Sequence, residues 1–318
     1  MSSIIPSVRL KVVSVSKLST TPCLRNYFWR YILNLEGRRI YLPFWFGGVL
    51  GAGFEALLLG KPVKAALRKE HLKRTKGYDI DDDMKEELKL QLRLISVILD
   101  GAKRQPSVKR MKLTQSQIKF RLKLKDSGVL FCGTEDGEGT YRGAGTLFET
   151  KAMKQVNSAF LTSLTYGKQI NGYAYARRTL GKSVVGQCCA CVFKKPGKKL
   201  KQGQSIDDFV DEIRQDVLDR PDMYFTWHKF NLGKQTVAGV GADIEREAYI
   251  LKMLYQDCGK DILNPLKWPK RENKCHDYAG CEFLQLCKNM RTWKLYLRYF
   301  KQREMLYKEE EEELATHE

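Results

Sequence analysis

The chain has 318 residues, of which 43% are hydrophobic and 29% charged, a composition typical of globular proteins with one large domain or two small ones. This composition argues against a chain dominated by disorder. Lys and Arg total 56 against 37 Asp and Glu, which gives a formal net charge of +19. A charge of this size favours a polyanionic partner such as DNA, RNA or an anionic membrane.

The sequence carries no pattern typical of a membrane-spanning or exported protein. Its longest apolar stretch, 41–59, is interrupted by glycines and by Glu55, and the first residues lack the layout of a signal peptide. We therefore expect a cytoplasmic protein without a membrane partner. The nine cysteines, an odd number, argue against a disulfide scaffold and leave reduced thiols or metal ligands. Most should be buried apolar side chains: Cys132, Cys188, Cys189, Cys191 and Cys258.

The first part of the chain, 1–112, is predicted to form strand and helical segments. Residues 8–16 alternate weakly as a strand, and 48–60 indicate a short apolar helix. Between 82 and 103 the apolar residues recur at helical spacing, and Asp81 to Asp83 precede them as potential caps. This pattern predicts a long amphipathic helix.

Residues 113–200 are predicted to form the core of the fold. Four strand-like runs occur over 117–125, 128–132, 146–152 and 183–194. A glycine-rich turn over 133–145 joins the second run to the third, and a helix over 163–180 precedes the fourth. Three strands, a helix and a returning strand predict an α/β fold with a small mixed sheet.

The C-terminal part is divided into 201–290 and a final segment, 291–318. It is predicted to hold two helices, a strand between them, a last helix and a solvated acidic tail, over 206–218, 242–255, 223–232, 291–307 and 309–313. Because there is no internal repeat and no long linker, residues 1–318 should fold as one elaborated domain.

Two carboxylates and a lysine stand out in the core. Asp136 follows the second strand-like run, and Glu149 and Lys151 lie two apart on the third, so that they share one face of the sheet. A hairpin would bring Asp136 beside them. Two adjacent carboxylates require a cation, and hard oxygen ligands suit Mg²⁺ or Mn²⁺. Such a site could hydrolyse a phosphodiester, although a Glu–Lys pair on a surface hairpin fits this short motif equally well.

A second pair of residues makes the pattern specific. Gln169 and Tyr173 lie four apart on the predicted helix and therefore on one face of it. The order G-x-x-D, E-x-K and Q-x-x-x-Y resembles the RecB-type branch of the PD-(D/E)XK nucleases.

This resemblance implies a restriction-endonuclease-like core with a small mixed central sheet flanked by helices, and a metal-dependent DNA exonuclease activity. It implies Asp136 and Glu149 as metal ligands, Lys151 as the catalytic lysine, and Gln169 and Tyr173 as DNA contacts. In phages such enzymes resect duplex ends for a single-strand annealing partner, and the protein would then act in the host cytoplasm. A ring-shaped homo-oligomer would explain processive digestion, although no feature of the sequence requires one.

The upstream helix departs from the family pattern. Family members carry a metal-binding His there, often four residues before a Glu, whereas this chain has Gly51 four residues before Glu55. Glu55 could supply a ligand instead, or the site could bind one metal rather than two. A Glu55 that merely faces solvent is the plain alternative.

Four cysteines form a second candidate metal site. Cys275, Cys281 and Cys287 follow one another at intervals of six, and Cys23 stands alone near the start. One early and three late cysteines resemble the [4Fe–4S] staple of AddB-type and CRISPR-associated exonucleases, although that family usually has a shorter first gap. Zinc is the alternative, because His276 follows Cys275 and Cys3His sites are common. Either metal would be structural.

Two basic runs, 194–201 and 103–112, could contact phosphates without sequence preference, or could simply be solvated. Two other functions remain compatible with the sequence. The loss of the His at Gly51 allows a nuclease-like DNA-binding protein without activity. A basic RNA-binding or assembly module is the other alternative, in which Asp136 and Glu149 would be incidental.

Overall fold

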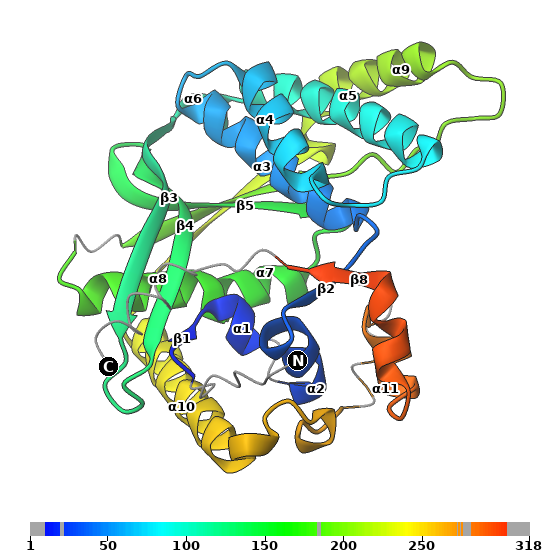
Figure 1. Ribbon diagram of the computed structural model, residues 1–318. Coiled ribbons are helices and arrows are strands. Elements are labelled where there is room, and N and C mark those ends of the chain that lie inside the picture. Colours follow the sequence, from blue (N-terminus) through cyan, green and yellow to red (C-terminus); the bar gives the residue numbers. More distant parts are fainter. Residues whose placement is uncertain are drawn as a thin grey trace.

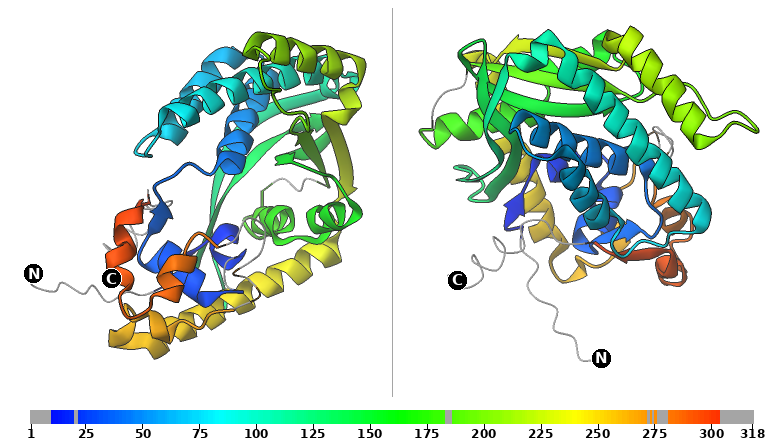
Figure 2. Two further views of the ribbon diagram at one scale, coloured as in Figure 1. Left: turned by 90° about the vertical axis from the view of Figure 1, so that its right-hand side faces the viewer. Right: turned by 90° about the horizontal axis from the view of Figure 1, so that it is seen from above.

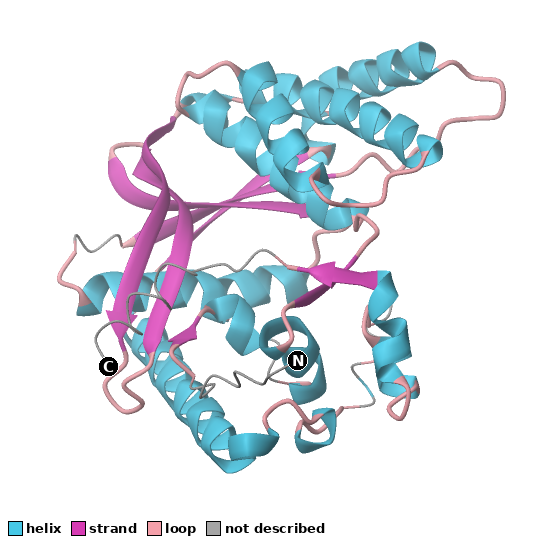
Figure 3. Ribbon diagram, in the orientation of Figure 1, coloured by secondary structure: helices cyan, strands magenta, loops and turns pink. Residues whose placement is uncertain are grey.

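A six-stranded mixed sheet lies between two groups of helices, as Figures 1 and 3 show. The computed structural model describes residues 10–19, 22–182, 186–271, 273, 275 and 281–303. The predicted fold class, an α/β fold with a small mixed central sheet flanked by helices, is confirmed.

The sheet is built around three consecutive antiparallel strands. Its strands are β1 (Val12–Val13), β3 (Met111–Lys123), β4 (Leu130–Tyr141), β5 (Ala144–Met153), β6 (Gln187–Lys194) and β7 (Phe225–Asn231). Strand β4 pairs with β3 along one edge and with β5 on the other, both antiparallel, and β1 adds a short parallel pairing to the start of β4. Strand β6 is parallel to β5, and β7 is antiparallel to β6. The predicted succession of three strands, a helix and a returning strand is therefore present.

The glycine-rich turn predicted over 133–145 is wrong. Strand β4 continues to Tyr141, and the turn consists of Arg142 and Gly143, which both have positive φ angles, of 53° and 80°. Two such residues match the twist of the flanking strands. At Gly139 the glycine is instead required by strand pairing, because a Cβ there would lie 1.8 Å from the carbonyl oxygen of Lys112 on β3.

Helices cover both faces of the sheet, as the turned views in Figure 2 show. One face carries α3 (Leu42–Leu58), α4 (Val63–Thr75), α5 (Asp82–Arg104), α6 (Pro106–Lys109) and α9 (Ile206–Asp219). The other carries α7 (Ser158–Tyr166), α8 (Lys168–Thr179) and α10 (Lys234–Cys258). Helix α5 begins as predicted, because the Asp81 side chain accepts a hydrogen bond from the Met84 amide.

Several helix boundaries differ from the predicted ones. The helix predicted over 163–180 is two helices, α7 and α8, separated at Gly167. A Cβ at Gly167 would lie 2.0 Å from the Ser163 carbonyl oxygen, so only glycine permits this close turn. Helix α4 was not predicted, because its sequence is largely basic and lacks a clear apolar stripe.

The two ends of the described chain pack together. Helices α1 (Val15–Ser19) and α2 (Leu24–Tyr27), the π-helical turn Phe28–Ile32 and strand β2 (Leu35–Gly37) come from the N-terminal side. Helix α11 (Leu284–Lys288), the 3-10 turn Trp293–Tyr299 and strand β8 (Phe300–Gln302) come from the C-terminal side. Further 3-10 turns span Pro221–Met223, Gly259–Asp261 and Pro265–Lys267. Strands β2 and β8 pair antiparallel, and Trp268 stacks on Tyr27 at a centroid distance of 5.9 Å.

The helix predicted over 291–307 is wrong in its type and extent within the described residues, where only the 3-10 turn Trp293–Tyr299 is helical. Pairing with β2 draws residues 300–302 into an extended strand, which outweighs their local helical pattern. The acidic run 309–313 lies outside the described residues. The five cysteines predicted to be buried are buried. Over the described ranges, no helix combines the length and the apolar character needed to cross a membrane.

A buried ion network joins α8 to β4. The Nε of Arg177 donates to both oxygens of Glu135, at 2.9 and 2.8 Å, and its guanidinium also contacts Glu138. Arg177 and Glu135 are 3% and 2% exposed, so water does not stabilise their charges and each charge is stabilised by the other. Burial is the main cause that raises the pKa of Glu135, and Arg177 opposes it.

We expect Arg177→Met to destabilise the protein by about 3–5 kcal/mol, because it leaves the Glu135 carboxylate buried without its partner. Urea unfolding followed by circular dichroism measures the change. Arg246→Met, which removes an exposed pair with Asp243, is the matched control and should cost less than about 1 kcal/mol. Equal effects of the two substitutions would contradict this account.

Candidate active site

Strands β4 and β5 bring the predicted carboxylates and lysine together. Their register pairs Gly137 with Phe148, so Asp136 and Glu149 lie one step further along opposite strands. The Oδ2 of Asp136 accepts a hydrogen bond of 2.9 Å from the Thr150 amide. The Nζ of Lys151 lies 2.5 Å from Oε1 of Glu149. The hairpin thus produces the cluster that the spacing predicted.

Helix α8 completes this cluster through Gln169. Its Oε1 accepts a hydrogen bond of 2.8 Å from Lys151, and its Nε2 donates to Oε1 of Glu149 at 2.9 Å. The same Nε2 lies 3.2 Å from the Tyr173 hydroxyl. Tyr173 is only 8% exposed, and its ring packs edge-on against Phe120. In this structure Gln169 therefore holds Glu149 and Lys151 in place, and the Tyr173 hydroxyl contacts Gln169 from the next turn of α8.

Burial makes the carboxylates of this cluster reluctant to ionise. It raises the pKa of Glu149 to about 7, with Lys151 opposing and Asp136 reinforcing the shift. Burial also raises the pKa of Asp136, against the hydrogen bond from Thr150. For Lys151, burial alone would lower the pKa, but Glu149 and Asp136 outweigh it and the pKa is raised. The cluster therefore has an excess of negative charge that a further cation would relieve.

The cluster opens onto a cleft of about 810 Å³. Oδ1 of Asp136 and Oε2 of Glu149 have no hydrogen-bond donor among the described residues, so two carboxylate oxygens remain available. Glu55 lines the same cleft, but its Oε2 accepts a hydrogen bond of 2.9 Å from Gln117. Gly51 also lines it, and a Cβ there would meet its nearest atom, in Thr150, only at 4.0 Å.

The two available carboxylate oxygens fit a magnesium or manganese ion. Within the ranges that the structure describes, no group of three or more His, Cys, Asp or Glu side chains is arranged so that it could hold a metal ion. Mg²⁺, however, keeps several waters and is commonly held by one or two carboxylates together with substrate phosphates. Asp136 and Glu149 provide two such carboxylates, which are buried together. Each has one oxygen without a hydrogen-bond donor among the described residues.

The four candidate cluster cysteines gather between the two ends of the described chain. The thiols of Cys23, Cys275 and Cys287 all help to raise the pKa of Cys281, although burial is the main cause. The indole Nε1 of Trp29 donates to Sγ of Cys287 at 3.3 Å. The side chains of all four are half-buried. His276, the alternative zinc ligand, lies outside the described residues.

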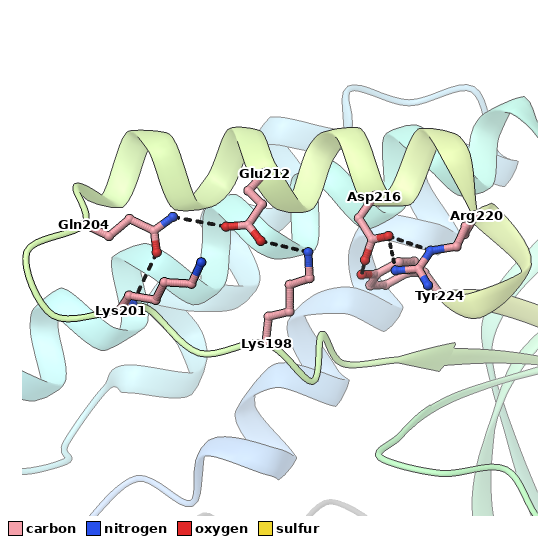
Figure 4. Close-up of polar contacts among 7 residues, drawn as sticks. All are labelled: Lys198, Lys201, Gln204, Glu212, Asp216, Arg220 and Tyr224. Atoms are coloured by element: carbon pink, nitrogen blue, oxygen red, sulfur yellow. Dashed lines mark hydrogen bonds and ion pairs between the residues drawn. The ribbon is translucent and has the colours of Figure 1, made fainter.

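The predicted basic loop over 194–201 runs beside α9 rather than standing free, as Figure 4 shows. Lys198 donates to Oε1 of Glu212 at 2.8 Å, and the Lys201 amide donates to Gln204 at 3.2 Å. Gln204 in turn donates to Oε2 of Glu212 at 3.1 Å. Part of the positive charge of this loop is thus neutralised within the protein.

The basic wall of the cleft was not predicted from the sequence. Helix α4 contributes Lys69, Lys73 and Arg74 to the lining, and Lys61 precedes the helix. Gln117, the partner of Glu55, was also missed; it lies within β3 and has a φ of 51°, which is unusual for a strand residue. The density of basic residues over 61–76 was the one available signal, and only the fold shows which of them face the cleft.

No family model and no curated protein matches this chain. Among solved structures, it is similar to a provisionally named exonuclease from Eubacterium rectale. The similarity has 12% sequence identity, a TM-score of 0.47, and covers 84% of this chain and 86% of the other. The site is therefore interpreted from its own geometry.

The metal-free protein should lose stability as pH rises through the titration of Glu149. The pKa of Glu149 is about 7 in the folded protein and 4.5 in its ordinary, unfolded environment. Between these pH values the folded state therefore binds one more proton than the unfolded state. Protonated Glu149 therefore adds to the free energy of unfolding below about pH 4.5, and this stabilisation is lost by about pH 7. The change is on the order of 3 kcal/mol.

Urea unfolding in EDTA across pH 4–8 measures this dependence. Glu149→Gln should flatten the decline, because the amide cannot ionise, and should be more stable than wild type at pH 8. Glu212→Gln, on the surface of α9, is the control and should leave the decline unchanged. A decline that persists in Glu149→Gln would show that another group causes it.

Proposed function

We propose that this protein is a metal-dependent nuclease that hydrolyses phosphodiester bonds in DNA, with the exonuclease mode that the motif order implies. The observation that carries the proposal is the convergence of Asp136, Glu149, Lys151 and Gln169 at a cleft, with the Glu149 side chain fully buried. A buried carboxylate of raised pKa, paired with a lysine in a cleft, is a feature of active sites.

Each side chain has a distinct role in this proposal. Asp136 and Glu149 would hold Mg²⁺ or Mn²⁺ through their available oxygens, and the bound ion would polarise the phosphate and acidify a water. Lys151 is kept charged by its two carboxylate neighbours, so its ammonium can orient the attacking water or offset charge that develops on the phosphate. Gln169 fixes the positions of Glu149 and Lys151.

The substitution of the family His by Gly51 is compatible with one metal rather than two. Space remains beside Gly51, and Glu55 is held by Gln117 on the same cleft wall. In our proposal Glu55 acts through water or joins the ligands through its Oε1, since Gln117 occupies only Oε2. Asp136 and Glu149 already provide as many carboxylates as Mg²⁺ commonly takes from a protein.

Digestion of end-labelled linear duplex and single-stranded DNA tests the function. With Mg²⁺ or Mn²⁺, wild-type protein should cut, and Asp136→Ala and Lys151→Ala should each lower the rate by at least about 100-fold, since each removes stabilisation of transition-state charge. Order of product release from each labelled end reports polarity and exonuclease mode.

Lys64→Ala, which removes an exposed lysine that does not line the cleft, is the matched control and should cut normally. DNA that stays intact with wild-type protein but is still bound would favour a nuclease-like binding protein without activity. Binding that survives changes to both carboxylates, without any digestion of DNA, would favour the RNA-binding or assembly alternative.

We also propose that Cys23, Cys275, Cys281 and Cys287 bind a [4Fe–4S] cluster that staples the chain ends. The four thiols are near enough to influence one another, and Asn26 and Trp29 direct N–H groups at two of the sulfurs. Because the arrangement of the described side chains is not that of a closed metal site, the thiols would have to rotate inward on binding. The cluster would be structural, since hydrolysis requires no electron transfer.

Protein purified without oxygen should be brown and absorb broadly near roughly 400 nm. Cys281→Ser should lose the colour and the iron and should unfold more easily, because metal binding is coupled to folding. Cys258→Ser, at a buried cysteine outside this set, should keep both. A colourless preparation that contains zinc would identify the alternative metal.

A further inference from the structure

The wall of the cleft formed by α4 is strongly basic. Lys61, Lys69 and Lys73 line the cleft and have no ion-pair partner within the part of the chain that the structure describes. Lys69 and Lys73 lie four apart on one helical face, an arrangement of like charges that weakens a helix unless an anion lies between them. This wall faces the same space as the carboxylates of Asp136 and Glu149.

Arg74 reaches from this wall across α3. Its Nε donates to Oε1 of Glu70 at 2.7 Å, which directs the guanidinium over Gly48. A Cβ at position 48 would lie 1.9 Å from Cζ of Arg74, so the guanidinium occupies space that only a glycine leaves open. The side chain is 38% exposed, and its remaining N–H groups can still donate to a ligand in the cleft.

The glycines of α3 form a smooth track from Arg74 to the catalytic cluster. Gly48, Gly47 and Gly51 all line the cleft. A Cβ at Gly47 would meet Ala152 at 3.6 Å, and one at Gly51 would meet Thr150 at 4.0 Å, so the track lies against the end of β5 that carries Lys151. Three to four helical residues advance about 4.5–6 Å, which is one to two nucleotide steps at the ~3.4 Å rise of one strand.

We propose that α4 and the glycine track bind one DNA strand in single-stranded form, with Arg74 holding a phosphate one or two nucleotides from the bond that is cut. The inference rests on the proposed nuclease function and adds the form of the substrate and the residues that hold it. Lys69 and Lys73 bind neighbouring phosphates. Arginine suits this role because its planar N–H groups match phosphate oxygens.

The size of the cleft favours a single strand. About 810 Å³ lies within the range of small-ligand pockets, which is enough for a few nucleotides of one strand rather than for a duplex. A duplex would have to separate its strands, or present an overhang, before its end could reach Asp136 and Glu149. The basic wall contributes binding that does not depend on base sequence.

Binding of a fluorescein-labelled oligothymidine in EDTA, measured by anisotropy over a range of salt concentrations, tests the inference without cleavage. Arg74→Gln should weaken binding on the order of tenfold. It should also reduce the slope of log affinity against log salt by about 0.7, the contribution of one phosphate contact on a single strand. A purely structural role of Arg74 would leave that slope unchanged.

Gly48→Ala keeps every charge but forces the flexible end of Arg74 aside. It should reproduce part of the loss, and it should add nothing in an Arg74→Gln background, because both changes act on the same contact. Its Tm should not fall, since alanine favours a helix more than glycine does. Arg68→Gln is the matched control on the same helix, because Arg68 is exposed and does not line the cleft.

Blunt duplex DNA should bind more weakly than the oligothymidine to wild-type protein and should be less affected by Arg74→Gln. If Arg74→Gln and Gly48→Ala bind the oligothymidine as wild type does, or if blunt duplex binds best, the inference is overturned. If wild-type protein cuts DNA but both variants bind the oligothymidine normally, the inference on Arg74 is overturned and the nuclease function is not. Loss of binding in the variants of a wild-type protein that never cuts DNA would instead overturn only the nuclease function.

Discussion

The antiparallel pairing of β4 with β5 is the constraint on which the site depends. Arg142 and Gly143 form the tight turn between the strands, and this turn sets the register that places Asp136 across from Glu149. A shift of one residue would move one set of side chains to the opposite face of the sheet. The length of β4 beyond its predicted end is therefore part of the candidate active site, because it carries Asp136 within the sheet.

Around this hairpin the protein keeps charge buried in two different ways. Arg177 and Glu135 neutralise each other behind the sheet and join α8 to β4. Glu149 and Lys151 neutralise each other incompletely, because Asp136 adds a second carboxylate and the pKa of Glu149 is raised to about 7. The first network ties α8 to β4, whereas the second leaves a deficit of positive charge that a divalent cation would relieve.

The cleft beside these carboxylates is shaped by two helices with opposite properties. Helix α3 presents glycines, which leave space beside the end of β5, and α4 presents Lys69, Lys73 and Arg74 to the same cleft. The contact of Arg74 with Gly48 joins the two, because the guanidinium lies where a side chain would otherwise stand. At the other side of the molecule, pairing of β2 with β8 draws the chain ends together and gathers the four half-buried cysteines.

The sequence by itself determined the helices and strands whose apolar residues recur regularly. It also determined which residues share one face of a strand or helix, because strand and helix geometry fixes their spacing. The helix over 82–103 is α5, and Glu149, Lys151 and Gln169 meet as their positions on a strand and a helix required. Tertiary contacts decided the rest. Pairing with β3 extended β4 through a glycine-rich stretch, pairing with β2 turned residues 300–302 of the predicted last helix into β8, and packing against α3 made α4 a cleft wall. A sequence pattern reports each segment's own preference, whereas pairing and close approach depend on partners distant in the chain.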